Sequence, residues 1–549
     1  MKELVAWSPS GGRLAKFRVL LLPLLYLAAT LIYSACMAPW GRQVDPESAY
    51  AMNGIVAAAG YGSMKFDHPG TTTTLLVEII VRLWALVARP EDIVAFGFKN
   101  YDAIIYATRS CEAVILFGAL LAGGIIVAKA TRSLIAAMVF QVGPFVHFDT
   151  FHIDMLLIPE SLMVSCAIFG MALVVRAALD DRPPTVRLGV VSGLIFALGF
   201  SSKYLYLPLA VLGVSLLRNP RAFKAVLIAG AIGFIAFNLV FNPAVFTRGF
   251  GWIFTVATHK GVYGAGEPGF VDASVFWSNM AELIAAAPLV FAIYVVAAVA
   301  SLAQMVRTRS WSDPVSLTLL AAFLAFTLQL VATSKHFALH YMMASWVLVV
   351  GVLVLAALQI RRVLPALPPA AIATVVAAMC VALIGQTLYE TRRQAIEWMA
   401  LGDVGARLSR AAAKAGPACA NVTAPFVRAP EDEINHGWHM TIAAWGTQEQ
   451  KERFSLSYAR AFEAPLIDHV ALMNVMTRNF RPATYKQLAA EYPCIVVRTN
   501  IPLDRENSPD LFEFNPDRCV IEGIHVTTVG IPCRTIVAAS VDMRSAALR

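Results

Sequence analysis

Apolar residues in this 549-residue chain gather in long runs separated by short polar stretches. Most runs are about twenty residues long, enough for an α-helix to cross the hydrocarbon core of a bilayer. The pattern predicts a polytopic membrane protein whose spans lie at 18–38, 111–128, 133–148, 156–175, 188–200, 204–217, 225–241, 283–303, 315–333, 339–358 and 370–388.

The run 71–88 is apolar enough to cross but carries Glu78 and Arg82. Basic loop residues of membrane proteins prefer the cytoplasmic side. If 71–88 does not cross, the later basic clusters fall on the same side as the basic N-terminus: Lys129/Arg132, Arg176/Arg182/Arg187, Arg218/Arg221/Lys224, Arg307/Arg309 and Arg361/Arg362. We therefore expect 71–88 to lie in or dip into the interface, within a first outer loop over 39–110.

The stretch 188–217 is too long for one span, and both of its flanks are basic. It is therefore expected to cross outward and return, turning near Ser201-Ser202-Lys203. Both halves are short, which predicts a turn below the outer surface, in a pocket walled by protein, because irregular backbone at that depth is tolerated only there.

The chain is expected to divide into a transmembrane domain over 1–389 and an exported soluble α/β domain over 390–549. In the tail, 485–491 is typical of a helix end, and 494–498, 525–529 and 535–539 are typical of strands. The basic N-terminus leads into a run too long for a signal-peptide core and lacks a small-residue cleavage site, so the first span is expected to stay uncleaved.

Composition supports a membrane protein, because 58% of residues are apolar and 15% are charged, against about a quarter charged in soluble domains. The mean hydropathy is +0.64. The net charge of +8 is what cytoplasmic loops of membrane proteins carry, so it does not indicate nucleic-acid binding.

Cysteine positions agree with this topology. Cys36, Cys111, Cys166 and Cys380 lie in predicted spans, and the four others, Cys419, Cys494, Cys519 and Cys533, lie in the tail. An even number in an exported domain predicts two disulfides, with three connectivities open. The spacing fits no zinc motif, and Asn421-Val-Thr is a glycosylation sequon without meaning in a bacterial protein.

Polar residues cluster in the loops on the outer side. The first outer loop holds Arg42, Asp45, Glu47, Asp67 and His68. The alternative interpretation of this group is a solvated loop with a Pro-Gly turn. A second, very short turn carries His147, Asp149, His152 and Asp154. Carboxylates facing one another across two loops would suit a divalent cation or a general base, whereas the alternative is a hydrated turn.

Basic residues stand at two further outer turns. Lys203 lies between two half-length spans, where it could extend to water or hold a phosphate. Lys335, His336, His340 and Tyr341 lie at another outer span end. Acids from two loops and bases from two others on one membrane face are the arrangement expected for group transfer from a phosphate-linked donor.

The order of these features resembles the GT-C superfamily of membrane glycosyltransferases, in particular the protein O-mannosyltransferases and the lipid A aminoarabinose transferase. Asp45 matches the family's acidic residue after span one, and Asp67-His68-Pro69-Gly70 resembles its His-Pro-Pro element. Asp154 matches the acid of the second outer loop, Ser202-Lys203 the Thr-Lys element, and His340-Tyr341 the late basic-Tyr element. The resemblance covers roughly residues 18–360.

Three departures bear on the subgroup and the acceptor. Gly70 replaces the second proline, His340 replaces an arginine, and Pro46 separates Asp45 from Glu47 where the family has a tandem acidic pair. The resemblance implies a GT-C-like transmembrane domain in which Asp45 acts as base or positions the acceptor. Asp154 and His68, with Asp45, would bind a divalent metal such as Mg, Mn or Zn, or orient the acceptor, and Lys203 would neutralise the lipid phosphate.

The leading hypothesis is therefore a hexosyl or pentosyl transferase of the bacterial inner membrane. It would use a polyprenyl-phosphate-sugar donor and a lipid, polysaccharide or protein acceptor outside the cytoplasm. Substrate-binding candidates are Lys203, Arg42, Glu47, Asp67, His68, His152, His340 and Tyr341. The rival is a secondary transporter, which usually has inverted repeats and charges at mid-membrane, and a polytopic cell-envelope assembly protein is a third class.

Overall fold

The computed structural model describes residues 18–38, 47–66, 69–415, 418–423, 430–462, 467–470, 475–478, 481–499, 502–505, 508–521 and 524–547. The chain forms two compact units. The first contains residues 1–33, 66–73 and 109–392, and the second contains 34–65, 74–108 and 393–549. Within the described residues, eight helices are long and apolar enough to cross a membrane.

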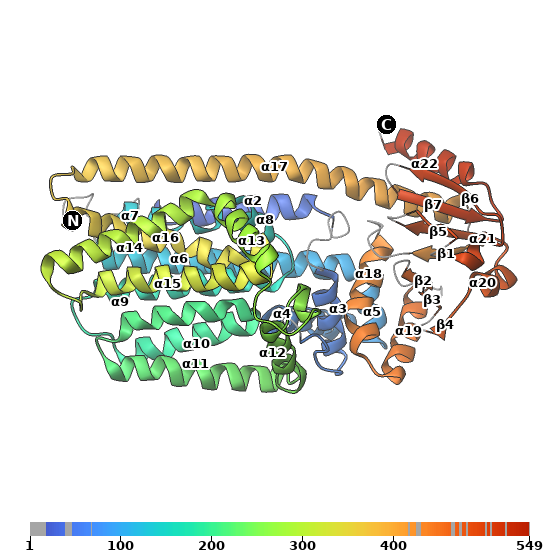
Figure 1. The fold of residues 1–549 in the computed structure, drawn as a ribbon. Helices are drawn as coiled ribbons and strands as arrows, with labels where there is room; N and C mark the ends of the chain where they lie inside the picture. The colour runs from blue at the N-terminus through green and yellow to red at the C-terminus, as the bar shows by residue number, and fades with distance from the viewer. Residues whose placement is uncertain are drawn as a thin grey trace. The chain divides into compact units, whose positions relative to one another are not determined.

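Helices make up the first unit (Figure 1). Their bounds, with the end of α2, the start of α6 and the last part of α17 counted in the second unit, are α2 Leu21–Cys36, α6 Tyr101–Thr131, α7 Leu134–Phe140, η2 Gly143–Phe145, α8 Phe148–Ile153, α9 Pro159–Leu179, α10 Val186–Ser202, η3 Tyr204–Leu216, α11 Pro220–Phe241, η4 Val245–Gly249, α12 Phe250–Thr258, η5 Val262–Gly264, α13 Ala273–Ala286, α14 Pro288–Thr308, α15 Pro314–Lys335, η6 Leu339–Met342, α16 Met343–Val363 and α17 Pro369–Ala415.

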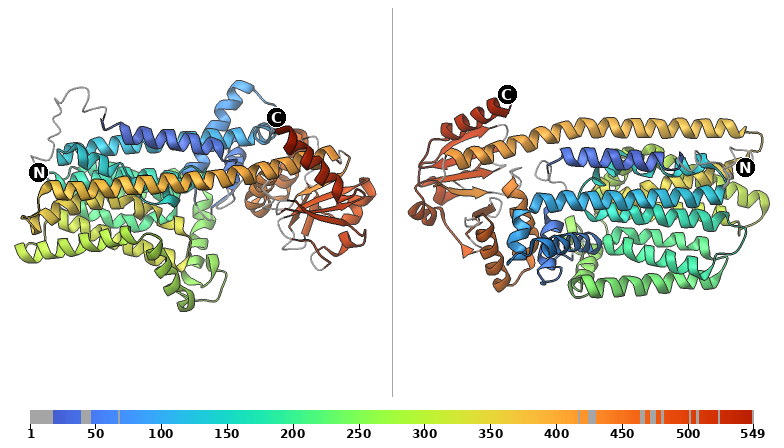
Figure 2. Two further views of the ribbon diagram at one scale, coloured as in Figure 1. Left: turned by 90° about the horizontal axis from the view of Figure 1, so that it is seen from above. Right: turned by 180° about the vertical axis from the view of Figure 1, so that it is seen from behind.

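Small residues let α10 and α11 approach closely. A Cβ atom on Gly193 would lie 2.5 Å from the carbonyl oxygen of Val226, and one on Gly189 would lie 2.2 Å from that of Ala222. Helices inside membranes associate through such close packing because the surrounding lipid offers no hydrophobic driving force. The two helices run side by side in Figure 1 and in the right-hand view of Figure 2.

The expected turn near Lys203 is confirmed. Helix α10 ends at Ser202, Lys203 is its C-terminal cap, and η3 returns as a 3-10 helix. A 3-10 helix rises about 2.0 Å per residue against 1.5 Å in an α-helix. The 13 residues of η3 therefore reach further across the bilayer than an α-helix of the same length.

The span expected at 133–148 is wrong as a continuous helix. Helix α7 has only 7 residues, and Pro144 lies in the short 3-10 turn η2 that follows. Residues 139–146 are buried in protein throughout, and the Gln141 side chain donates to the carbonyl oxygens of Val19 and Leu120. Irregular backbone at membrane depth needs such protein partners, so this passage is made of short helices.

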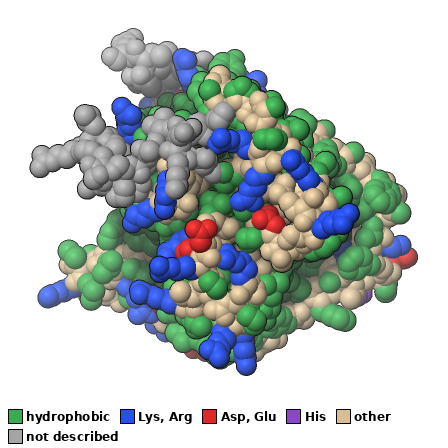
Figure 3. Space-filling model, turned by 90° about the vertical axis from the view of Figure 1, so that its left-hand side faces the viewer, with side chains coloured by type: hydrophobic (Ala, Val, Ile, Leu, Met, Phe, Trp, Pro, Cys, Tyr) green, Lys and Arg blue, Asp and Glu red, His purple; other side chains and the backbone are tan. Residues whose placement is uncertain are grey.

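Basic residues gather at one end of these helices, called the basic end below. Arg176, Arg307, Arg361 and Arg362 lie in the last turns of α9, α14 and α16, and Arg187 and Arg221 lie in the first turns of α10 and α11. Figure 3 looks onto this end, where Lys and Arg side chains outnumber Asp and Glu. The clusters used to predict the topology thus share one end of the bundle.

The second unit combines parts of the first outer loop with the tail. It holds α3 Glu47–Ala58, most of α4 Thr71–Ala88, and α5 Ile93–Lys99, together with α18 Pro430–Trp438, η7 His439–Ala443 and α19 Gln448–Phe462. The hydroxyl of Ser457 in α19 donates to Asp92, the N-cap of α5, at 2.7 Å. A Cβ on Gly437 of α18 would lie 2.5 Å from the carbonyl oxygen of Ser48, so loop and tail are closely packed within this unit.

The tail carries a mixed sheet. Its strands are β1 Ala420–Thr423, β2 Ile467–Val470, β3 Val475–Arg478, β4 Arg481–Pro482, β5 Ile495–Thr499, β6 Asp517–Ile521 and β7 Ile524–Val529, in the order β4-β3-β2-β1-β5-β7-β6. Strand β1 is parallel to β2 and β5, and the other pairs are antiparallel. The remaining helices are α20 Tyr485–Glu491, α21 Pro509–Phe512 and α22 Cys533–Ala547.

The side chains of successive β5 residues pack into two different hydrophobic cores. Val496 packs with Leu408 of α17, whereas Ile495 and Val497 pack with Leu488 of α20, as the alternation of side chains along a strand requires. The expected helix at 485–491 and strands at 494–498 and 525–529 are confirmed. The expected strand at 535–539 is wrong, because these residues belong to α22, whose Ile536 packs onto the Val496 core.

Both predicted disulfides are present, as Cys419–Cys494 and Cys519–Cys533. The first joins the residues that precede the parallel neighbours β1 and β5, where Ala420 is in register with Ile495.

Candidate functional site

Lys203 forms a buried ion pair with Glu160. The ammonium group bonds to Oε1 of Glu160, and the two side chains are 1% and 0% exposed. Glu160 follows Pro159 in the first turn of α9, where an acidic side chain also interacts favourably with the helix dipole. Both residues lie at the end of the bundle opposite the basic end, since α9 finishes with Arg176 and α10 begins near Arg187.

Two side chains from η6 complete the surroundings of this pair. The Lys203 ammonium lies 4.2 Å from the centre of the Tyr341 ring, which a cation favours because the ring face is electron-rich. Nε2 of His340 lies 3.7 Å from Oε1 of Glu160, and the two rings of His340 and Tyr341 are 4.5 Å apart. The amide of Gln329 in α15 donates to the Tyr341 carbonyl oxygen at 2.7 Å and so holds η6 in place.

The loop after α12 also reaches Tyr341. Tyr263 has φ 53°, an uncommon conformation outside glycine, and its hydroxyl lies 3.2 Å from that of Tyr341. Its backbone N–H donates to Nε2 of His336 at 3.0 Å. Burial, with the nearby Lys335 charge as a second cause, lowers the pKa of His336, which favours the neutral ring that this hydrogen bond needs.

Asp154 lies six residues before Glu160 and is differently placed. It caps the C-terminus of α8 and is 1% exposed. Within the described residues, neither carboxylate oxygen has a hydrogen-bond partner. Burial raises the pKa of Asp154 well above its ordinary value, because a low dielectric disfavours the charged form.

The other residues singled out from the sequence are placed as follows. His152 is 1% exposed in α8, and its ring stacks on Phe148 with centres 5.5 Å apart. Glu47 opens α3 in the second unit and is 4% exposed. Arg42, Asp45, Asp67 and His68 lie outside the described residues. The structure thus brings Lys203, His340 and Tyr341 together around Glu160.

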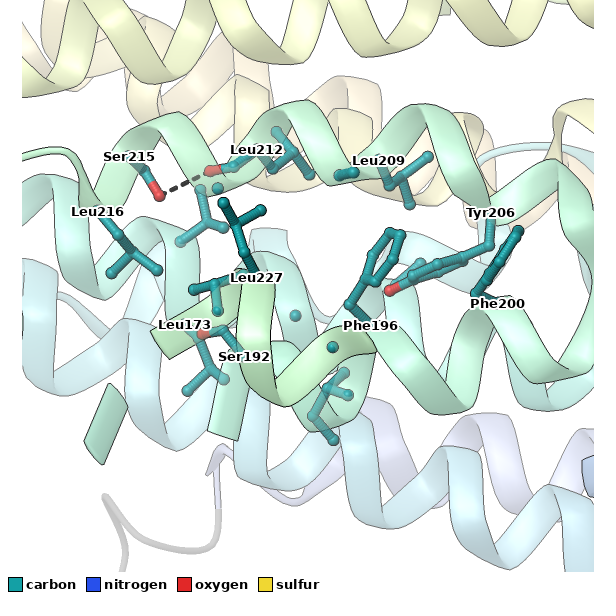
Figure 4. Close-up of a pocket in the computed structure, with 18 of the residues that line it drawn as sticks. Leu173, Ser192, Phe196, Phe200, Tyr206, Leu209, Leu212, Ser215, Leu216 and Leu227 are labelled. Atoms are coloured by element: carbon teal, nitrogen blue, oxygen red, sulfur yellow. Dashed lines mark hydrogen bonds between the residues drawn. The ribbon is translucent and has the colours of Figure 1, made fainter. Parts of the chain in front are cut away.

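A cavity of about 270 Å³ lies between α9, α10, η3 and α11. Its lining is almost wholly apolar, and Figure 4 shows Tyr206 between Phe196 and Phe200 at one end and Leu216 toward the other. Tyr206 is three residues after Lys203, and its backbone N–H donates to the Lys203 carbonyl oxygen. Leu227 of the lining is 54% exposed on the surface of the helix bundle. The cavity therefore extends from near the ion pair toward the basic end.

Of the three ligands expected for a divalent metal, Asp154 lies among the described residues. The buried oxygens of Asp154 are hard donors without a protein partner. No group of three or more His, Cys, Asp or Glu side chains that could hold a metal is found in the described part of the chain. The two other expected ligands, Asp45 and His68, lie outside it.

No protein-family model and no curated protein sequence matches this chain. Two crystal structures of ArnT from Cupriavidus metallidurans are similar to it. The structure bound to undecaprenyl phosphate has a TM-score of 0.43 and 12% identity, covering 92% of this chain and 97% of that one. The apo structure has a TM-score of 0.44 and 12% identity, covering 92% and 98%. A likeness at 12% identity with TM-scores below 0.5 assigns no function to this chain.

Sequence reasoning missed Glu160 and Tyr263. Glu160 falls inside the span predicted at 156–175, and an ionisable residue within a span is a functional candidate by default. That signal was available, because the side chain had to find a partner at membrane depth. Tyr263 lies in a Gly-rich loop between two spans, and nothing in its sequence surroundings indicates that it contacts Tyr341.

Proposed function

We propose that this chain is a glycosyltransferase that moves a sugar from a polyprenyl-phosphate donor to an acceptor on the extracytoplasmic face. The observation that carries the proposal is the Lys203 ammonium, buried beside Glu160 and Tyr341 at the end opposite the basic end. A buried, charged and rigidly held cation at a span end is suited to a lipid-linked phosphate, whose head lies at that level of the bilayer.

The proposed reaction is a single displacement with inversion at the sugar carbon. An acceptor hydroxyl attacks the anomeric carbon, the bond between that carbon and the phosphate oxygen breaks, and polyprenyl phosphate leaves with an added negative charge. Lys203 would neutralise this charge, and in a dry site such stabilisation is stronger than in water. Glu160 holds the Lys203 ammonium in position before the donor arrives. Asp45 would accept the proton of the acceptor hydroxyl, as the GT-C resemblance implies.

The polyprenyl tail would lie in the cavity that begins beside Tyr206. Its apolar lining matches an isoprenoid chain, and it starts three residues from the proposed phosphate ligand and runs along the membrane-spanning helices. A divalent metal, if the enzyme uses one, would take Asp154 as a ligand and screen charge between donor and acceptor. The proposed setting is the bacterial inner membrane, with a cytoplasmic N-terminus and an exported C-terminal unit.

Binding of a fluorescent polyprenyl phosphate to the purified protein tests the donor site. We expect Lys203→Met to weaken binding at least tenfold. The charge-matched double variant Glu160→Gln/Lys203→Met should remain equally weak although its buried charge is balanced. Lys335→Met, at a neighbouring helix end, is the control and should bind as the wild type does. Equal binding of the uncharged polyprenol would contradict a phosphate site at Lys203.

Asp45→Asn separates chemistry from binding. It preserves the shape of the side chain but removes the base, so release of polyprenyl phosphate from labelled hexosyl and pentosyl donors should be lost while donor binding persists. Full transfer by this variant would refute the assigned role. Substrate uptake into vesicles without any transfer would instead support the rival transporter.

A further inference from the structure

A second apolar groove lies at the basic end, between α7, α16 and α17, away from the proposed active site. Its volume is about 80 Å³. The residues that line it along the membrane-spanning part are Ile135, Val139, Val354, Leu358, Ile372 and Val376. At the end of the groove stand Arg361, from the last turn of α16, and the small polar residues Thr131 and Ser133.

Among the described residues Arg361 has no protein partner, in contrast to three arginines at the same end of the bundle. The guanidinium of Arg362 lies 3.3 Å from Asp313, and that of Arg307 donates to the Val363 carbonyl oxygen at 2.9 Å. Arg218 likewise donates to the carbonyl oxygens of Asp180 and Asp181. In the part of the chain that the structure describes, Arg361 makes no such hydrogen bond or ion pair, although it stands at the mouth of an apolar groove.

The adjoining helix α17 is little covered by protein. Only 11% of its apolar stretch is buried. A hydrogen bond holds this helix at a position away from the groove. There the Thr387 hydroxyl donates to the Phe145 carbonyl oxygen at 2.9 Å. At the basic end, 14 or so residues earlier in the helix, the groove separates α17 from α7 and α16. In a membrane, such a space is filled by a lipid chain because water is excluded there.

We propose that this groove binds an anionic glycerophospholipid, with one acyl chain between α17 and α16 and the phosphate on Arg361. The charge of the groove mouth favours an anionic lipid. Arg361 can donate hydrogen bonds to the lipid phosphate. Arg132, between the lining residues Thr131 and Ser133, is exposed and adds a second positive charge. Basic pockets between transmembrane helices on the cytoplasmic side are suited to acidic headgroups. The bound lipid would fill the space beside α17 and hold the basic end of this helix in place.

Thermal stability and native mass spectrometry of the full chain test this site. The probes are phosphatidylglycerol and phosphatidylcholine with identical acyl chains, added to delipidated protein in detergent. We expect phosphatidylglycerol to bind at least fivefold more tightly and to raise the unfolding midpoint more. Arg361→Gln should reduce this preference about fivefold, since one basic residue near an anionic surface contributes about that factor. Arg362→Gln, whose guanidinium already bonds to Asp313, should retain it.

A second variant tests the acyl-chain half of the site without changing charge. Ala373→Leu, in the α17 wall of the groove, should fill the space and weaken both lipids equally. Equal binding of the two lipids to wild type, or an unchanged preference in Arg361→Gln, would overturn the proposal. Unchanged binding to Ala373→Leu would overturn the assignment of this groove.

Discussion

Lys203, the C-terminal cap of α10, forms an ion pair with Glu160 in the first turn of α9, and neither side chain reaches solvent. Removing two charges from water is costly, and their mutual attraction offsets this only when the geometry is good. A pair so costly to bury needs a reason beyond stability. Holding one ammonium group ready for a phosphate is such a reason.

Glu160→Gln should therefore destabilise the protein strongly. It leaves the buried Lys203 charge without its counter-charge, which typically costs about 3–5 kcal/mol. Adding Lys203→Met should restore most of the lost stability because no buried charge remains. Midpoints of thermal unfolding in one detergent give the comparison. If Glu160→Gln alone and Lys203→Met alone are both as stable as the wild type, the ion pair is not formed in the protein.

The hydrogen bond between the hydroxyls of Tyr263 and Tyr341 should contribute modestly to the free energy of unfolding. Tyr341→Phe keeps the ring beside Lys203 and removes one hydroxyl, for a cost of about 1 kcal/mol. Tyr263→Phe should cost the same, and the double variant should cost no more than either, because all three remove one interaction. Tyr341→Leu should cost about 2 kcal/mol more, since it also removes the ring contact with the cation. Additive single effects would contradict this contact.

Stability should depend on pH through Asp154. Its folded pKa is raised by burial, so the folded state holds this proton at pH values where the unfolded chain has lost it. The contribution of Asp154 to the free energy of unfolding is fully present below its ordinary pKa of 3.8. This contribution is lost as the pH rises through the higher pKa of the folded state. Asp154→Asn removes the effect, so its unfolding midpoint should exceed that of wild type at pH 8 and approach it at pH 4. A constant difference across this range would show that Asp154 has a protein or metal partner.

The two disulfides should differ in their effects. Cys419–Cys494 and Cys519–Cys533 have sequence separations of 75 and 14 residues. The entropy of the closed loops in the unfolded chain gives upper contributions of about 4.5 and about 3 kcal/mol. Paired Cys→Ala substitutions should therefore cost more at the first bridge than at the second, as measured by protease resistance of the C-terminal unit. The reverse order would indicate that the Cys519–Cys533 bridge acts mainly on the folded state.

The position of 71–88 remains a prediction. Helix α4 is long and apolar enough to cross, and 33% of it is buried, but neither property sets its orientation. Reporter fusions after Ala88 and Leu388 should both indicate the outer side. A fusion after Arg309 at the basic end serves as the control and should indicate the inner side. A cytoplasmic signal after Ala88 would require that α4 crosses.

The membrane helices were predictable because their pattern is set by the bilayer, which demands about twenty apolar residues per crossing. The same rule gave the wrong picture for 133–148, where protein rather than lipid surrounds the backbone and allows a Pro144 turn. In the tail, 535–539 is rich in β-branched and small residues, but packing onto the Val496 core makes it helical. At the site, Lys203, His340 and Tyr341 were predictable as polar residues at span ends. Glu160, the partner of Lys203 and His340, was hidden inside a span.

The bridge between Cys419 and Cys494 has a consequence for the order of biogenesis. It joins the residues just before strands β1 and β5, which are hydrogen-bonded neighbours, and its two cysteines are 75 residues apart in the sequence. During synthesis β1 leaves the ribosome well before β5, so the centre of the sheet stays open until nearly the whole chain has been translated. Its covalent closure also needs an oxidising compartment. With the proposed export of the C-terminal unit, this unit should mature after translocation, and an oxidoreductase outside the cytoplasm would control how much native protein accumulates.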